Sequence, residues 1–302
     1  MGEGIPGIGP EGGDGEIDGA PDASGPLRPA GAGSARSLLL TILGELVLPH
    51  REPVWTSTLL YVLKGLGLEE QTARQAIARG AGAGWIAGDK QGREVRWTLT
   101  DAGRQVIADG SHRVHAVRTP EPWDGDWLVL LVTIPQARKT VRKRLYSALS
   151  WAGFGNPAAG VWVSPHPERA KEVARIIHDL ELRDSAVGFV GPTLSVGMSE
   201  EEIVRRAWDL DDLAAQYQEL IERFADQTPG PGDESLFTLV NLVNEWQRFP
   251  FLDPQLPEEL LPGWIGRRAV ELFVSRRRAW VGAARERWRE LAEATAPAGQ
   301  DA

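Results

Sequence analysis

The segment 55–99 constrains the fold more than any other part of the chain. Within 55–66 the apolar residues recur at helical spacing, which predicts a helix with one buried face. Gly65 and Gly67 interrupt this pattern, as the turn between two helices requires. An acidic pair follows at 69–70, where negative charge favours the start of a helix. We therefore expect two short helices joined by a tight turn.

The second of these helices is predicted to have a small apolar face and a polar outer face. Ala73, Ala76 and Ile77 recur at three- and four-residue spacing and should point inward. The outer face then carries Thr72, Arg74, Gln75 and Arg79. After a glycine-rich break at 80–84, two short runs flank a polar turn at Asp89–Gly92, and the second run alternates as a β-strand does. Helix, turn, helix and hairpin together predict a winged helix-turn-helix.

The chemistry of the polar face suits DNA. An α-helix fits the major groove, where Arg and Gln form bidentate hydrogen bonds with base edges. Lys90 and Arg93 lie at the predicted hairpin tip, within reach of phosphates or the minor groove. The candidate DNA-binding residues are therefore Thr72, Arg74, Gln75, Arg79, Lys90 and Arg93. The alternative is a small helical domain with a solvated polar face.

Composition limits the remaining possibilities. The chain has 302 residues, enough for two or three domains, and no cysteine, so it has neither disulfides nor thiolate metal sites. The absence of cysteine fits a cytoplasmic protein, and we see no secretory signal and no apolar run of about 18 residues that would predict a membrane span. The net charge is −9, but residues 34–118 hold eleven basic against eight acidic side chains. Only the segment with the helix-turn-helix pattern is clearly positive.

The N-terminal region divides into an arm and a domain. Residues 1–33 are rich in Gly and Pro and are expected to be disordered. Ser34 is a candidate N-cap for a helix that Pro49 ends, and this helix opens a winged-helix domain over 34–118. Thr100 is expected to cap a further helix, over 101–115. Its histidines at 112 and 115 are best explained as solvated side chains, so we expect no metal site.

The middle of the chain, 119–198, alternates between strand and helix patterns. A buried strand precedes a basic amphipathic helix over 136–151, two short strands surround an Asn156-Pro157 turn, and a helix over 168–182 precedes a last strand. This βαββαβ order is typical of a ferredoxin-like domain. Asp124 and Asp126 are candidate ligands of a divalent ion, but a turn before the first strand explains them better.

The last third of the chain is predicted to be helical. Residues 199–291 carry amphipathic patterns that Asp209–Asp212 divides in one place, and a Pro-punctuated segment over 249–264 precedes a long final helix. Residues 292–302 are expected to form a loose tail. The predicted fold class is therefore α+β, with a winged helix, a ferredoxin-like domain and an all-helical domain in that order.

Six segments give this chain a resemblance to a known family, the PaaX-like transcriptional regulators. They are SARSLLLTILGELV at 34–47, TARQAIARGAGAGWI at 72–86, LTDAGRQVI at 99–107, WDGDWLVLLVTIP at 123–135, LSWAGFGNPAAGVWVSP at 149–165 and FPFLDPQLPEELLPGW at 249–264. The chain departs from the family in its long arm and in the Gly and Ala residues at 80–84. The resemblance implies a homodimeric repressor of a catabolic operon, which binds a palindromic DNA operator and is released by an aryl-acyl-CoA such as phenylacetyl-CoA.

An acyl-CoA effector requires an apolar slot and cations for its phosphates. The C-terminal third offers aromatic and arginine side chains around its Pro-rich segment. The candidate effector-binding residues are Trp246, Arg248, Phe249, Trp264, Arg267 and Arg268. The alternative is that the aromatic rings belong to the core and the arginines are surface charges.

Two other function classes remain open at this point. One is an enzyme, either a metal-dependent nuclease that uses the ferredoxin-like domain or a CoA-ester hydrolase. The sequence offers few candidate catalytic residues for either. The chain has five scattered histidines and no G-x-S-x-G motif. A plain architectural DNA-binding protein would respond to no small molecule. We therefore expect a non-enzymatic, ligand-responsive regulator without a bound cofactor.

Overall fold

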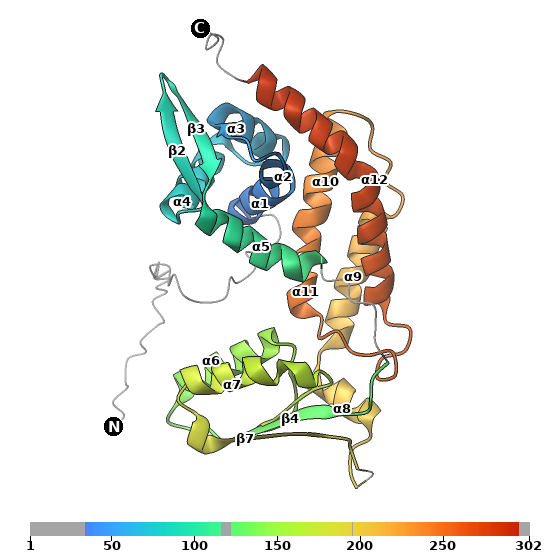
Figure 1. Cartoon of the computed structure of the whole chain (residues 1–302). Coiled ribbons are helices and arrows are strands. Elements are labelled where there is room, and N and C mark those ends of the chain that lie inside the picture. The colour runs from blue at the N-terminus through green and yellow to red at the C-terminus, as the bar shows by residue number, and fades with distance from the viewer. Residues whose placement is uncertain (1–33, 116–121, 195, 296–302) are drawn as a thin grey trace, which may run out of the picture.

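The computed structural model of the chain describes residues 34–115, 122–194 and 196–295 (Figure 1). The arm predicted to be disordered, 1–33, lies outside the described residues, as do 296–302 of the predicted tail. The side chains at 112 and 115 are likewise outside the described part. Among the described residues, no helix combines the length and the apolar character needed to cross a membrane.

The N-terminal part has the predicted helix-turn-helix and hairpin. Its elements are α1 (Ala35–Ile42), a π-helical turn (Leu43–Val47), α2 (Leu48–His50), β1 (Val54–Trp55), α3 (Thr56–Gly65), α4 (Glu70–Gly82), β2 (Ile86–Gln91), β3 (Glu94–Leu99) and α5 (Asp101–His115). The predicted caps are confirmed, because Ser34 Oγ accepts a hydrogen bond from the Ser37 amide and Thr100 Oγ1 accepts one from the Gly103 amide.

Three boundaries in this part differ from the sequence prediction. Helical structure continues past Pro49 to His50, because proline is tolerated in the first turn of the short α2. The hairpin turn is shorter than the predicted Asp89–Gly92, because Gln91 pairs directly with Glu94. Helix α4 extends into the predicted glycine break and ends at Gly82, and a Cβ at Gly80 would lie 3.0 Å from Leu39 Cδ2 of α1. Gly80 thus permits close packing of two helices rather than ending one.

The central part is the predicted ferredoxin-like βαββαβ unit. It comprises β4 (Trp127–Val132), α6 (Lys139–Trp151), β5 (Gly155–Ala158), β6 (Val161–Ser164), α7 (Ala170–Asp179) and β7 (Ala186–Gly191). The sheet is antiparallel with strand order β5-β6-β4-β7, and α6 and α7 cover one face (Figure 1). The predicted turn at Asn156-Pro157 is wrong, since both residues belong to β5. The Asn156 side chain donates to the Val161 carbonyl across the hairpin (2.6 Å).

The C-terminal part is helical, as predicted. Its elements are α8 (Glu200–Ala207), α9 (Leu210–Phe224), α10 (Asp233–Trp246), α11 (Phe249–Leu252) and α12 (Ile265–Ala294). The predicted division of the first helical stretch is confirmed, because Asp209 caps α9 through the amide of Asp212. The last helix continues three residues beyond the predicted end at 291.

One hydrophobic core joins the winged helix to the C-terminal helices. Leu39 and Ile42 of α1 belong to the same buried cluster as Leu239 of α10 and Trp280 of α12. Helix α10 stands directly beside the winged-helix elements in Figure 1. The Ser37 hydroxyl donates a buried hydrogen bond to Asn244 Oδ1 (2.6 Å), which fixes α1 against α10. The first and last thirds of the chain therefore form one packing unit.

The central sheet has a core on each face. The α6 and α7 side holds Leu128, Leu145 and Trp162, among others. On the other face Trp127 packs with Val204 of α8 and with Leu256 and Leu260 of the Pro-rich segment. Two motifs quoted for the family resemblance, the tryptophan-rich stretch before β4 and the Pro-rich segment, thus meet in one small core.

The shared core also contains an ion pair that spans the chain. Glu45 is buried in the π-helical turn, and its carboxylate accepts hydrogen bonds from Arg277 of α12 at 2.8 and 3.2 Å.

We predict that Arg277→Ala lowers the free energy of unfolding by about 2 kcal/mol, less than for a fully buried pair because Arg277 is partly exposed to water. Urea denaturation measures the effect. The neighbouring exposed Arg278→Ala is the control, and an equal loss in both variants would contradict the role of the pair.

Candidate nucleic-acid interface

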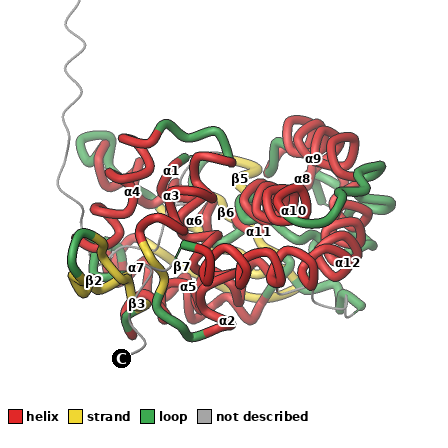
Figure 2. The backbone as a smooth tube through the Cα atoms, turned by 90° about the horizontal axis from the view of Figure 1, so that it is seen from above, coloured by secondary structure: helices red, strands yellow, loops and turns green. Residues whose placement is uncertain are grey.

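Helix α4 presents the polar face that the sequence predicts. Ala73, Ala76 and Ile77 are buried against the core, because small side chains allow the helix to lie close to α1 and α3. The exposed side chains of the outer face are Arg74, Gln75 and Arg79, while Thr72 is partly buried. Figure 2 shows α4 and the β2–β3 hairpin at one edge of the molecule, opposite α9 and α12. The surface of α4 is therefore accessible to a large partner.

A small ion-pair network holds Arg74 at the start of this helix. Glu70 Oε1 accepts hydrogen bonds from Arg74 Nη2 (2.9 Å) and Nε (3.1 Å), and Glu70 Oε2 accepts one from Lys64 Nζ (3.1 Å). The hydrogen bonds from Arg74 and Lys64 lower the pKa of Glu70, so it remains ionised. Exposed pairs of this kind are weak, and Arg74 can exchange its carboxylate partner for a phosphate or a base edge at little cost.

The hairpin is fixed to the helices at its base and exposed at its tip. Trp97 Nε1 donates to Thr56 Oγ1 (2.9 Å), and Thr56 Oγ1 donates to the Val95 carbonyl (3.0 Å), which ties β3 to the start of α3. Lys90 and Arg93 are exposed toward the tip. The two-residue loop includes Gly92 at φ +64°, a conformation that favours glycine. A rigid base with cations at the tip is the arrangement that a DNA-binding wing requires.

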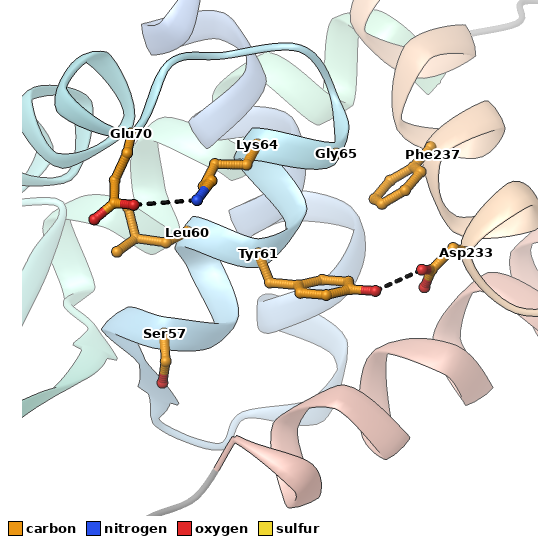
Figure 3. A pocket seen from close by; sticks show the side chains of 8 residues that line it. All are labelled: Ser57, Leu60, Tyr61, Lys64, Gly65, Glu70, Asp233 and Phe237. Atoms are coloured by element: carbon orange, nitrogen blue, oxygen red, sulfur yellow. Dashed lines mark hydrogen bonds and ion pairs between the residues drawn. The ribbon is translucent and has the colours of Figure 1, made fainter.

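A pocket lies where the helix-turn-helix meets α10 (Figure 3). It has a volume of about 520 Å³, and it is lined by Ser57, Leu60, Tyr61, Lys64, Gly65, Glu70, Asp233 and Phe237. The Tyr61 hydroxyl donates to Asp233 Oδ2 (2.6 Å), and Arg287 Nε donates to Asp233 Oδ1 (2.7 Å). Burial opposes ionisation of Asp233, yet the hydrogen bonds from Tyr61 and Arg287 lower its pKa. The pocket wall thus connects α3, α10 and α12.

The sequence did not point to this pocket. The sequence pattern indicates only that Gly65 interrupts a helix, whereas the structure shows that Gly65 also leaves space for the Phe237 ring. A Cβ at Gly65 would lie 2.1 Å from Phe237 Cζ, so the ring packs against the bare backbone of α3. The contact joins residues 172 positions apart, and no local pattern reveals such a pairing. Glu70 lines the pocket and also accepts hydrogen bonds from Arg74, so the pocket adjoins α4, the candidate recognition helix.

The structure brings the aromatic members of the candidate effector site together, but as parts of the core. Trp246 and Phe249 are buried, and Trp246 stacks on Phe273 with ring centroids 4.6 Å apart. Phe249 stacks on Tyr217 at 4.2 Å. Trp264 is partly buried and donates from Nε1 to Asp253 Oδ2 (2.9 Å), which also accepts from the Tyr217 hydroxyl (2.8 Å). Burial raises the pKa of Tyr217, so this hydroxyl stays a hydrogen-bond donor.

The three arginines of that candidate site have different environments. Arg267 is engaged in the fold, because its Nη1 donates to the Leu261 carbonyl (2.9 Å) and pairs with Glu258 (2.5 Å). Arg268 is exposed. Arg248 lies over the Phe249 ring at 4.9 Å, and its buried Nε has no hydrogen-bond partner among the described residues. Arg248 also attracts the carboxylate of Glu245, so Arg268 is the one of the three whose side chain is exposed to an anion from solution.

The described residues contain no cluster of three or more side chains suited to hold a metal ion. Asp124 instead accepts a hydrogen bond from the Asp126 amide (3.0 Å) across Gly125, whose φ is +92°. The Trp123 indole donates to the Asp126 carbonyl (2.9 Å). These bonds support the turn that the sequence favoured over a cation site.

Comparisons with known proteins agree with this architecture along most of the described chain. A model described as PaaX-like protein matches residues 34–103, one described as PaaX protein central Cas2-like domain matches 120–203, and one described as PaaX-like protein C-terminal domain matches 208–290. The transcriptional repressor PaaX of Escherichia coli strain K12 is 27% identical over 254 residues, covering 80% of this chain and 79% of the repressor.

A solved structure shows the same fold. It is an uncharacterized protein, Rv0674, from Mycobacterium tuberculosis, which matches with a TM-score of 0.58 at 21% identity. The match covers 86% of this chain and 99% of that one. At this identity the likeness concerns the fold alone.

The packing of Trp246 yields a prediction that separates a core role from a ligand role. We expect Trp246→Ala to lower the free energy of unfolding by about 3–5 kcal/mol, because it removes a large buried ring and leaves a cavity. Chemical denaturation followed by circular dichroism measures this. Arg268→Ala, at an exposed position, should leave stability unchanged. Native stability in the Trp246 variant, combined with lost ligand binding, would show that the ring faces a ligand instead.

Proposed function

Since the chain belongs to the PaaX-like family, we propose that it is a transcriptional repressor that binds operator DNA through α4 and the β2–β3 wing. The observation that carries this proposal is the accessible face of α4 with Arg74, Gln75 and Arg79, next to a hairpin with exposed Lys90 and Arg93. Arginine and glutamine on a helix suit base edges in the major groove, and cations on a wing suit phosphates.

The repressor acts on DNA without catalysing a reaction. A related protein named for repression supports this. Thr72 lies near the start of α4, and in this type of docking the N-terminal residues of the recognition helix contact base edges. The protein works in the cytoplasm, where its operator DNA lies.

The repressor binds as a homodimer. Two recognition helices then occupy successive major grooves, roughly 34 Å apart, and the operator is palindromic. A dimer also doubles the positive charge that each winged helix brings to the phosphates, which matters for a chain with an overall net charge of −9.

The repressor controls a catabolic operon and leaves the operator when it binds an aryl-acyl-CoA such as phenylacetyl-CoA. Support for an anionic effector comes from Arg268, whose side chain is exposed, with Arg248 as a second cation next to the Pro-rich segment. Trp246, Phe249, Trp264 and Arg267 then act as the rigid frame behind this site. Because α10 shares its core with α1, a ligand that shifts α10 also shifts the DNA-binding helices.

Arg74 provides a direct test of the DNA-binding surface. We expect Arg74→Ala to weaken operator binding by about 5- to 150-fold, the cost of about 1–3 kcal/mol for a lost bidentate base contact. Fluorescence anisotropy with the protein's own upstream DNA measures the affinity. Arg278→Ala removes an exposed arginine of α12, away from α4, and should bind as the parent does. Unchanged affinity in the Arg74 variant would remove this residue from the interface.

The effector proposal is tested on the same DNA with and without phenylacetyl-CoA. We expect the thioester to release the protein from the operator, and we expect operator DNA to weaken thioester binding by the same factor, because the two affinities are coupled. Free coenzyme A and phenylacetate are the matched controls. A thioester that binds equally well to free and DNA-bound protein would contradict this mechanism and leave the DNA-binding proposal intact.

A further inference from the structure

Strand β7 forms an edge of the central sheet and exposes large apolar side chains. The strand pairs with β4 on one side, and no described strand pairs with its other side. Val187, Phe189 and Val190 are 63%, 52% and 49% exposed, and Leu131 of β4, opposite Val187, is 41% exposed. Val187, Phe189 and Leu131 share one face of the sheet, while Val190 lies on the other, and contiguous exposed apolar surface such as the first three form marks an interaction site.

The two edge strands of this sheet differ in the features that prevent pairing with another chain. Edge strands normally carry a charge, a proline or an irregularity that prevents pairing with another chain. Strand β5, at the opposite edge, has Pro157 and a shift in its register with β6. Strand β7 reads AVGFVG, without a charge or a proline, and pairs with β4 in unbroken register from Ala186 to Gly191. One edge is protected and the other is open.

We propose that β7 pairs antiparallel with β7 of a second copy of this chain, so that two four-stranded sheets become one continuous sheet. The inference rests on the proposed dimeric function and names its interface. A two-fold axis perpendicular to the sheet relates the two copies, so each copy contributes the same strand to the interface. Unpaired backbone N–H and C=O groups of each edge then find partners, and the exposed apolar side chains pack beside those of the other copy.

The strand sequence selects a register for this pairing. Such an axis places residues of the same face opposite each other. When the axis passes through Gly188, Val187 of each copy lies opposite Phe189 of the other. Val187 and Phe189 share a face with Leu131, because Val187 pairs with Leu131 and Phe189 with Val129. Pairs of an aromatic and a β-branched residue across strands are stabilising, and here two such pairs flank the axis.

A second copy fits this edge better than the remaining segments of this chain do. Residues 1–33 contain five prolines, which cannot donate the amide hydrogen bonds that pairing with β7 requires. They also carry a net charge of −5, and β7 has no basic residue to attract them. Residues 296–302 contain no β-branched or aromatic side chain. The fold favours a second copy too, because α6 and α7 lie between the sheet and the winged helix (Figure 1). The perpendicular axis therefore leaves both winged helices on the same side of the joined sheet.

A charge introduced at Phe189 tests the interface in the full-length chain. In size-exclusion chromatography with light scattering at micromolar concentration, we expect the parent to show twice the chain mass of 33.0 kDa. Phe189→Lys should reduce this to the mass of one chain, because it places an unpaired charge in each half of the interface. Val274→Lys, at an exposed apolar position on α12, is the control and should remain dimeric. Circular dichroism checks that every variant is folded.

The double variant Val187→Asp/Phe189→Lys tests the register. In the pairing centred on Gly188, each new lysine faces an aspartate of the other copy, so the dimer should return. A double variant that stays monomeric would overturn this register. A dimeric Phe189→Lys protein would overturn the interface while leaving a dimeric repressor possible. A monomeric parent that still binds its upstream DNA would overturn the β7 dimer and leave the DNA-binding proposal standing.

Discussion

The packing of α1 against α10 and α12 is the contact on which the rest of the structure depends. Helix α1 lies at the centre of the winged helix, yet its buried face is completed by side chains more than 190 residues further along the chain. The Ser37–Asn244 hydrogen bond and the Glu45–Arg277 ion pair fix its position within this contact. The hydrogen bond joins α1 to α10, and the ion pair joins the π-helical turn after α1 to α12, where a buried charge that loses its partner is costly. The DNA-binding unit is therefore built on the C-terminal helices.

This shared core connects the C-terminal helices to the candidate recognition helix. Helix α3 meets α10 through the Gly65–Phe237 contact and the Tyr61–Asp233 hydrogen bond, and α4 begins at Glu70 on the same pocket wall. A change in the position of α10 therefore acts on α3 and α4 through packed side chains rather than through a flexible linker. Close-packed interiors transmit such shifts because they leave little free space. The proposed effector response uses this connection.

The central domain is organised by different contacts. Its sheet has its own cores, and the one facing α8 is filled by Trp127, Val163 and the leucines of the Pro-rich segment. Asp253 orders that segment by accepting hydrogen bonds from Tyr217 and Trp264, and Arg267 holds it through the Leu261 carbonyl. The motifs that most clearly mark the family resemblance thus serve to join the central domain to the helical one. These motifs stabilise the fold through packing and hydrogen bonds.

Local patterns in the sequence were sufficient for most of the elements and for the polar face of α4. The spacing of Ala73, Ala76 and Ile77 determines which side of α4 is buried, and the hydroxyls of Ser34 and Thr100 determine where two helices begin, because these effects act over three or four residues. Tertiary structure alone decided which elements share a core. The partner of Glu45, the burial of Trp246 and Phe249, the pocket at Gly65 and the position of β7 at an edge all depend on segments far apart in the chain. Periodicity shows that a face is apolar, but only the assembled fold shows which surface covers it.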